Sequence, residues 1–223
     1  MSSKLAEKNE DDLRLRRGEE SRRSLIQATI TAVAQNGLSG TTLNVVALLA
    51  GVSRALVGFH FSSKEQLLDA ALENALYTYD KSLKAALASA SDDPLPQITA
   101  FIKHDIQFAA THNELLSLWF AAWGEVRVTN KYRQSLLPID HKYRDEIATF
   151  LTKLLQNPVE AKRRATMLDA FIYGIWLECH IDPDSYQLAN NLLIADSLVQ
   201  LVSSTTTFSA GQKLPELTRQ HSH

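Results

Sequence analysis

The sequence of 223 residues is poor in cysteine and has no long apolar run. Its one cysteine, Cys179, excludes a disulfide bond within the chain. The first 24 residues are too rich in charge for the apolar core of a secretory signal. The longest nearly uncharged apolar runs, 115–124 and 170–177, reach about half of the ~20 residues that cross a bilayer. We therefore expect a cytoplasmic protein that does not contact membranes.

Sequence motifs of the common enzyme classes are also missing. The chain has no glycine-rich nucleotide loop, no Gly-x-Ser-x-Gly and no His-Glu-x-x-His. Helical di-metal enzymes need Glu-x-x-His pairs, and none of the seven histidines follows an acidic residue at that spacing. Cys179 falls on an apolar helix face and is expected in the core. The sequence thus predicts no enzymatic activity, no metal and no cofactor.

What the sequence does contain is helical periodicity. Leu25, Ile26, Ile30 and Val33 recur at helical spacing, and Asn36-Gly37 is suited to end that helix. Strand alternation and internal repeats are absent, so we expect an all-α protein. Further helices are predicted at about 42–50, 53–60, 64–88, 95–112, 114–130, 138–156, 158–181 and 184–204.

The charge is unevenly distributed along the chain. The segment from Leu13 to Lys64 carries a net charge of +5, although the whole chain carries −2. A basic segment on an otherwise acidic protein suggests a local contact with a polyanion. A solvated, charged helix face is an alternative that the charge alone leaves open.

Residues 42–61 have the pattern of two short helices joined by a tight turn. Gly51 supplies the positive φ that such a turn needs, and Ser53 can cap the helix that follows. Val46, Val57 and Phe61 lie where apolar anchors would hold the second helix in place. Helices this short do not persist alone, so a packed helix-turn-helix is predicted.

The same residues carry a resemblance to a known family. Thr-x(7)-Ala-Gly-Val-Ser, followed by His-Phe-x-x-Lys-Glu-x-Leu-Leu, resembles the DNA-binding domain of TetR-family transcriptional regulators over about 19–79. The resemblance implies a TetR-like fold, with an N-terminal three-helix helix-turn-helix domain and a C-terminal helical domain for ligand binding and dimerisation. We place the C-terminal domain at 80–204, with a flexible arm at 1–18 and a flexible tail at 205–223.

The resemblance also implies which residues contact DNA. Arg54 can bond a guanine bidentately and Leu56 can pack on a thymine methyl group, whereas Lys64 lies where the family contacts phosphates. Phe59 could instead belong to the core, and His60 could simply end its helix. The full expected set is Thr42, Ser53, Arg54, Ala55, Leu56, Gly58, Phe59, His60 and Lys64. Gly58 departs from the family, which often has tyrosine there. Arg14, Arg16 and Arg17 could form a basic arm or remain solvated.

Two aromatic segments, 116–123 and 169–177, resemble the BetI-type subgroup, repressors of choline-to-betaine genes. Helical spacing puts Asp169 and Trp176 on one face. The expected ligand-binding residues are Trp119, Phe120, Trp123, Asp169, Tyr173 and Trp176. If this face meets the helix that carries Trp119 and Trp123, the two form a cavity with aromatic walls and an acidic group at its edge. Ring faces attract quaternary ammonium groups, so such a cavity suits a cation. The aromatic cluster could equally be core, and Tyr173 replaces an aspartate of the subgroup, which puts choline itself in doubt.

The predicted partners follow from these two domains. Helices 158–181 and 184–204 are apolar on more than one face, which suggests a homodimer on a palindromic site in double-stranded DNA. A small-molecule effector would release this repressor, with coupling through helix 64–88. A DNA-binding regulator without a ligand is the alternative.

Overall fold

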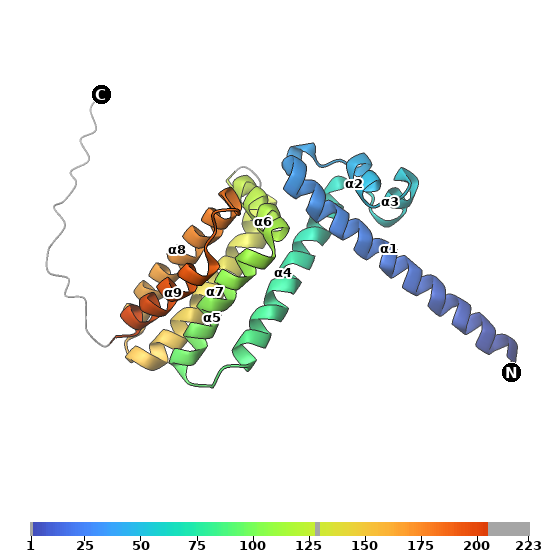
Figure 1. Cartoon of the computed structure of the whole chain (residues 1–223). Coiled ribbons are helices and arrows are strands. Elements are labelled where there is room, and N and C mark those ends of the chain that lie inside the picture. The colour runs from blue at the N-terminus through green and yellow to red at the C-terminus, as the bar shows by residue number, and fades with distance from the viewer. Residues whose placement is uncertain (1, 128–129, 205–223) are drawn as a thin grey trace, which may run out of the picture.

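The computed structural model describes residues 2–127 and 130–204, with side chains for all of these except 2–12, 131 and 135. In this part of the chain it contains nine helices and no strand, which confirms the all-α prediction (Figure 1). They are α1 (Ser2–Gly40), α2 (Leu43–Leu49), α3 (Arg54–His60), α4 (Lys64–Ala88), α5 (Pro94–Thr111), α6 (Asn113–Glu125), α7 (Asn130–Leu155), α8 (Pro158–Ile181) and α9 (Leu188–Ser203). The tail predicted at 205–223 lies outside the described residues.

The first three helices form the N-terminal domain around a small core. Gly37 has a φ of 66° and bends α1 near its end, as the Asn36-Gly37 pair predicts. Gly51 has a φ of 67°, and the chain direction changes by 109° between α2 and α3. Val46 and Val57 are fully buried where the two helices meet. The residues expected to anchor a helix-turn-helix therefore do so.

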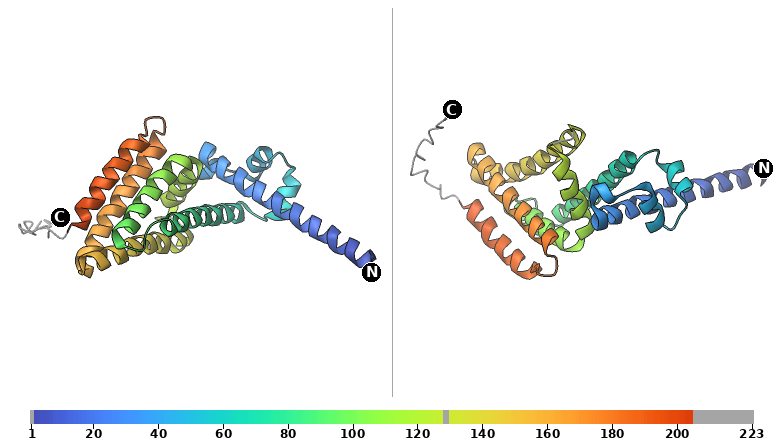
Figure 2. Two further views of the ribbon diagram at one scale, coloured as in Figure 1. Left: turned by 60° about the horizontal axis from the view of Figure 1, so that its bottom comes forward. Right: turned by 90° about the horizontal axis from the view of Figure 1, so that it is seen from above.

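Helix α1 is longer than the sequence predicts. The structure continues it back to Ser2, so residues 2–18 of the flexible arm expected at 1–18 are helical. Burial on α1 begins at Leu25, and the N-terminal half projects past α2 and α3 (Figures 1 and 2). The expectation of an arm followed from the absence of apolar periodicity before Leu25, and that absence predicts lack of packing but does not exclude a helix.

The remaining helices form the C-terminal bundle. Helix α5 runs through it and packs on α4, α7, α8 and α9, with Phe101, Ile102 and Ile106 almost completely buried. Helix α4 belongs to this bundle and runs from it to the N-terminal domain, where it contacts α1 (Figure 1). Cys179 is buried and its thiol donates to the carbonyl of Ala109 at 3.4 Å, in keeping with a core residue.

The boundary between α6 and α7 differs from the prediction. Helix α6 ends at Glu125, and α7 begins at Asn130 instead of 138, with Pro138 in its interior. An interior proline loses a backbone hydrogen bond and costs about 3 kcal/mol. The buried side chains of Leu136, Tyr143 and Ile147 on one face of α7 offset that cost.

Helix α9 begins at Leu188 instead of 184. Asp182 Oδ1 accepts a hydrogen bond from the backbone of Ser185 at 3.3 Å, which closes a single turn. Tyr186 then donates to the carbonyl of Ile106 at 3.0 Å and holds the chain on α5. The Asp-Pro signal therefore marks a turn, and the helix starts one turn later.

Candidate DNA interface and candidate ligand cavity

The helix-turn-helix presents α3 as a capped, exposed helix. Ser53 Oγ accepts from the backbone N–H of Leu56 at 3.2 Å, and Thr42 Oγ1 caps α2 through Val45 at 3.2 Å. These hydrogen bonds satisfy amides that would otherwise be free at the helix N-termini. Both hydroxyl groups therefore have a structural role on the surface where the sequence places DNA contacts.

The expected DNA-contacting side chains lie on the open side of α3. Arg54 and Ala55 are exposed, Leu56 is half-buried, and Val57 is directed into the core. Phe59 is 82% exposed, so the alternative that it belongs to the core is wrong. Its ring is therefore accessible to a partner that binds α3.

Gly58 leaves space for Arg54. A Cβ atom at position 58 would lie 3.3 Å from Nη1 of Arg54, which is a tight contact with a flexible side chain. The guanidinium can therefore fold back over the glycine, one turn along α3. This close approach of Arg54 accounts for a glycine at position 58, where the family often has tyrosine.

Lys64 is held differently from the prediction. Its Nζ donates to the backbone carbonyl of Leu38 at the end of α1. This hydrogen bond ties the first residue of α4 to the N-terminal domain. Before Lys64 can bind a phosphate it has to leave or share this carbonyl.

Inside the C-terminal bundle, aromatic side chains from several helices surround a cavity. The cavity has a volume of about 40 Å³ and lies between α4, α5, α6, α7 and α8. Its walls are formed by Tyr79, Phe101, Asp105, Trp119, Trp123, Asp140, Tyr143, Ile147, Asp169, Ile172, Tyr173 and Trp176. Neighbouring rings in these walls meet edge to face. The ring centroids of Trp119 and Trp123 are 6.1 Å apart, and those of Trp123 and Tyr173 are 4.9 Å apart.

Three carboxylates line this cavity. Asp169 accepts from Nε of Arg144 at 2.7 Å, and burial still raises its pKa. Asp105 is 1% exposed; its Oδ1 accepts from the hydroxyl of Tyr79 and lies 3.3 Å from Nδ1 of His104. Burial also raises the pKa of Asp105 against the opposing effect of these two partners.

Asp140 is the third carboxylate of the cavity, and its pKa is raised. Burial and the nearby carboxylate of Asp169 raise the pKa of Asp140 to about 6, although Arg144 and the Tyr173 hydroxyl act in the opposite direction. A carboxylate with this pKa is ionised at neutral pH but poorly solvated. Such a group favours an additional cation nearby.

The indole N–H groups differ in their hydrogen bonding. Trp176 Nε1 donates to the backbone carbonyl of Asp105 at 3.1 Å, which fixes the plane of its ring. Nε1 of Trp119 and of Trp123 are buried and have no hydrogen-bond partner among the described residues. Buried donors without a partner are rare, so the cavity can still accept an oxygen atom.

The structure brings together five of the six residues expected at the ligand site. Phe120 is the exception: it stacks on His180 at 4.9 Å and lines a neighbouring open groove with Trp123, Asp140 and Tyr173. Sequence reasoning missed Asp105 and Asp140. The signal for Asp105 was the polar pair with His104 in an otherwise apolar helix, whereas Asp140 follows Pro138, where the sequence predicted only a helix start.

Two helices connect the cavity with the N-terminal domain. Helix α4 carries Tyr79 at the cavity and Lys64 at its other end. Helix α6 carries Trp119, and its Glu114 accepts from Gln27 at 3.3 Å and from Thr31 at 3.0 Å on α1. Sequence analysis named the first of these connections and missed the second.

Among residues 2–127 and 130–204, no group of three or more His, Cys, Asp or Glu side chains is arranged to hold a metal ion. No single described helix is long and apolar enough to cross a membrane, and only the bent pair α2 and α3 meets that test when taken together.

The fold and the exposed α3 define a helix-turn-helix DNA-binding protein with a separate helical domain. The sequence model "Bacterial regulatory proteins, tetR family" matches residues 25–71, and "BetI-type transcriptional repressor, C-terminal" matches 94–202. The chain belongs to the TetR family, with a C-terminal domain of the BetI type. It is a DNA-binding transcriptional regulator and not an enzyme.

Individual proteins agree with this assignment. The chain is 26% identical over 181 residues to the HTH-type transcriptional regulator BetI of Paraburkholderia xenovorans, covering 81% of this chain and 92% of that one. It is 26% identical over 175 residues to BetI of Pseudomonas aeruginosa, covering 78% and 88%.

Solved structures show the same fold. A transcriptional regulator from Pseudomonas aeruginosa PAO1 superposes with a TM-score of 0.70 at 23% identity, over 83% of this chain and 91% of that one. A regulator from Saccharomonospora viridis, crystallised in complex with choline, superposes with a TM-score of 0.71 at 19% identity, over 82% and 96%.

Proposed function

We propose that this protein is a homodimeric repressor that binds a palindromic operator and is released from it by a small organic cation, such as a quaternary amine of choline's size. The observation that carries the proposal is the lining of the small cavity, where aromatic rings and partly or fully buried carboxylates from five helices come together. The choline complex of the Saccharomonospora viridis regulator supports a ligand of this class.

The charge balance in the cavity favours a cation over neutral or anionic ligands. Arg144 is the cationic partner of Asp169, whereas Asp140 has a raised pKa near 6. A cation beside Asp140 would stabilise its ionised form, and the ring faces of Trp119 and Tyr173 would attract the same charge. An anion would have to approach these carboxylates without compensation.

Tyr173, which departs from the BetI subgroup, is compatible with this proposal. The subgroup's aspartate at that position is absent, but the Tyr173 hydroxyl interacts with Asp140, which supplies a carboxylate from α7 instead of α8. We infer that Asp140 takes over the electrostatic role, and that the tyrosine adds a ring to the wall.

The homodimer is supported by exposed apolar side chains on the outer helices. Helices α8 and α9 lie side by side along one outer side of the bundle (Figures 1 and 2). Their large exposed apolar residues are Val159, Met167, Leu177, Ile181, Leu193, Ile194 and Leu201. A second copy placed across a twofold axis would cover this surface and place two α3 helices on a palindromic site.

Release requires that the ligand prefers an arrangement of the dimer that does not fit the operator. Helices α4 and α6 reach from the cavity to the N-terminal domain through Lys64 and through Glu114, respectively. A shift of either helix would change the spacing of the two α3 helices. A hundredfold preference of the ligand corresponds to about 2.7 kcal/mol per site.

The test is release of an operator selected by this protein from random-sequence DNA. Choline and its uncharged isostere 3,3-dimethylbutan-1-ol are compared as effectors, with wild type, Trp176→Leu and the exposed-ring control Tyr77→Ala. We expect choline to release DNA from wild type and the control, and neither compound to act on Trp176→Leu. If both compounds released DNA equally well, the effector would not need a positive charge. If choline released DNA from Trp176→Leu as it does from wild type, the effector would not bind in this cavity.

A further inference from the structure

We propose that the N-terminal half of α1 is a second DNA contact, which binds phosphates flanking the site that α3 reads. The contact is formed by residues 14–23, the arginine segment, whose five arginines are Arg14, Arg16, Arg17, Arg22 and Arg23. This stretch precedes residues 25–71, which the family's DNA-binding model matches. It therefore adds to the DNA contacts of the helix-turn-helix.

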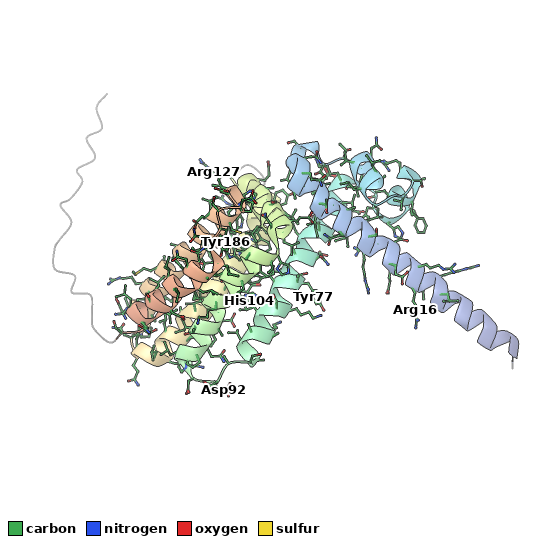
Figure 3. All side chains as sticks on the ribbon, viewed as in Figure 1. Arg16, Tyr77, Asp92, His104, Arg127 and Tyr186 are labelled. Atoms are coloured by element: carbon green, nitrogen blue, oxygen red, sulfur yellow. The ribbon has the colours of Figure 1, made fainter. Side chains whose placement is uncertain are left out.

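The arginine segment is a helix that packs on almost nothing. Arg14, Arg16 and Arg17 are exposed, and so are the neighbouring Leu13 and Leu15, at 46% and 67%. Figures 1 and 2 show this half of α1 extending away from the rest of the molecule, and Figure 3 shows Arg16 directed into open space. An isolated helix is marginal in water, so a partner that pairs with its charges would stabilise it.

The position of the arginine segment relative to α3 favours DNA as that partner. The guanidinium of Arg22 lies 5.1 Å from the centre of the Phe61 ring, and Phe61 is the residue that ends α3. The arginines therefore begin beside the C-terminal end of the recognition helix. When α3 occupies a major groove, the structure beside its end lies over the phosphate backbone at the edge of that groove.

The helix-turn-helix alone has few charges with which to bind DNA. From Ser24 to Ser63 the sequence contains no acidic residue and one cation, Arg54. The next cation, Lys64, donates to the Leu38 carbonyl. Because phosphate neutralisation supplies most of the sequence-independent affinity for DNA, the arginine segment provides the positive charge that the motif lacks.

The extent of this contact is limited by acidic residues. Asp11 and Asp12 precede the arginine segment, so the surface that suits phosphates ends near Arg14. Within it, Glu19 pairs with Arg23 at 3.9 Å, but both side chains are largely exposed and such a pair is weak. The arginine segment reads no bases and should contribute equally to all DNA sequences.

The test compares two triple variants with the same change in charge. Arg14→Gln/Arg16→Gln/Arg17→Gln removes three cations from the arginine segment and keeps good helix formers. Lys81→Gln/Lys153→Gln/Lys162→Gln removes three exposed cations from the C-terminal bundle. Binding to the selected operator is measured between ~50 and ~200 mM salt, with long flanks and with flanks trimmed to the recognised half-sites.

We expect the arginine variant to bind every DNA about ten- to a hundredfold more weakly, with a salt dependence reduced by about one to three phosphate contacts per chain. Trimming the flanks should weaken wild type and the lysine variant but leave the arginine variant unchanged. The proposal is overturned if the arginine variant keeps the wild-type salt dependence and flank dependence. It is also overturned if both variants lose affinity equally, because the effect would then reflect net charge alone.

Discussion

Asp140 shows how one side chain of the cavity can serve ligand binding at the expense of stability. It is partly buried, it lies near a second carboxylate, and its pKa is raised to about 6. A carboxylate in this position destabilises the empty protein at neutral pH and attracts a cation. Asp169 forms an ion pair with Arg144, and Asp105 accepts a hydrogen bond from Tyr79. The pKa of Asp140 stays near 6 although Arg144 and the Tyr173 hydroxyl lower it, so ligand charge should depend most on this carboxylate.

Asp140→Asn should weaken choline binding at pH 7.5 by at least about tenfold, or ~1.4 kcal/mol, because the ionised carboxylate is lost. Wild-type affinity should fall towards that of the variant as the pH decreases through 6, since Asp140 then becomes protonated. Tryptophan fluorescence titrations at pH 5.0 and 7.5 measure both effects. Equal pH dependence in the two proteins would show that another group controls binding.

The same variant has an opposite effect on stability. Because the folded-state pKa of Asp140 lies above its ordinary value of 3.8, its contribution to stability is full below that value and is lost as the pH rises through 6. Asparagine avoids this loss. We expect the unfolding temperature of Asp140→Asn to exceed that of wild type at pH 7.5 by roughly 2–4 °C, after allowance for solvent screening. At pH 3.5 the two unfolding temperatures should be equal.

Arg54 and Lys64 should differ in how they affect DNA binding. Arg54→Ala should cost about 1–3 kcal/mol and relax the base preference at one position of each half-site. Lys64→Ala should weaken all sequences alike and also lower the unfolding temperature, because the Leu38 carbonyl loses its donor. The affinities of both variants for selected and for random DNA, together with their unfolding temperatures, distinguish these two effects. An unchanged unfolding temperature of Lys64→Ala would show that its hydrogen bond adds no stability.

At the scale of the element, the sequence predicted helices well where local signals determine them. Gly51 and Ser53 fix the turn of the helix-turn-helix through backbone geometry and capping, and both predictions are confirmed. The start of α7 was missed because Pro138 is tolerated only when Leu136 and Tyr143 are buried by other helices. Such long-range burial leaves no mark near the proline in the sequence.

The ligand site shows the same division between local and long-range information. Helical spacing places Trp119 with Trp123 and Asp169 with Trp176, because each pair belongs to one helix. It could not reveal that α5 and α7 add Asp105 and Asp140 to the same cavity. It also could not show that Phe120, only one residue from Trp119, turns towards His180.

The outer face of α9 gives a prediction about assembly. Leu193 is 68% exposed in the single chain and lies on α9 with the exposed Ile194 and Leu201. A group of exposed apolar side chains can mark a protein–protein interface. Leu193→Glu should convert the proposed homodimer to monomers in sedimentation velocity, whereas Leu95→Glu, at an exposed leucine at the start of α5, should remain dimeric. A Leu193→Glu protein that stays dimeric to the same extent as the control would place the interface elsewhere.

At the scale of the whole molecule, the two domains are joined by α4 and by the contact of α6 with α1. Glu114→Ala removes the acceptor of both Gln27 and Thr31 without touching the cavity. We expect choline affinity within about twofold of wild type, and less release of operator DNA per bound choline. Asp145→Ala, an exposed acid on α7, serves as the control. Normal release by Glu114→Ala would leave α4 as the connection that matters.

We propose that a cation in the aromatic cavity and operator DNA on α3 favour different arrangements of one dimer. The most direct test is choline affinity measured by calorimetry on the free protein and on the protein saturated with operator. Linkage requires the operator to weaken choline binding by the same factor by which choline weakens operator binding, and we expect at least about tenfold. Equal choline affinity in the free and DNA-bound protein would contradict the claim.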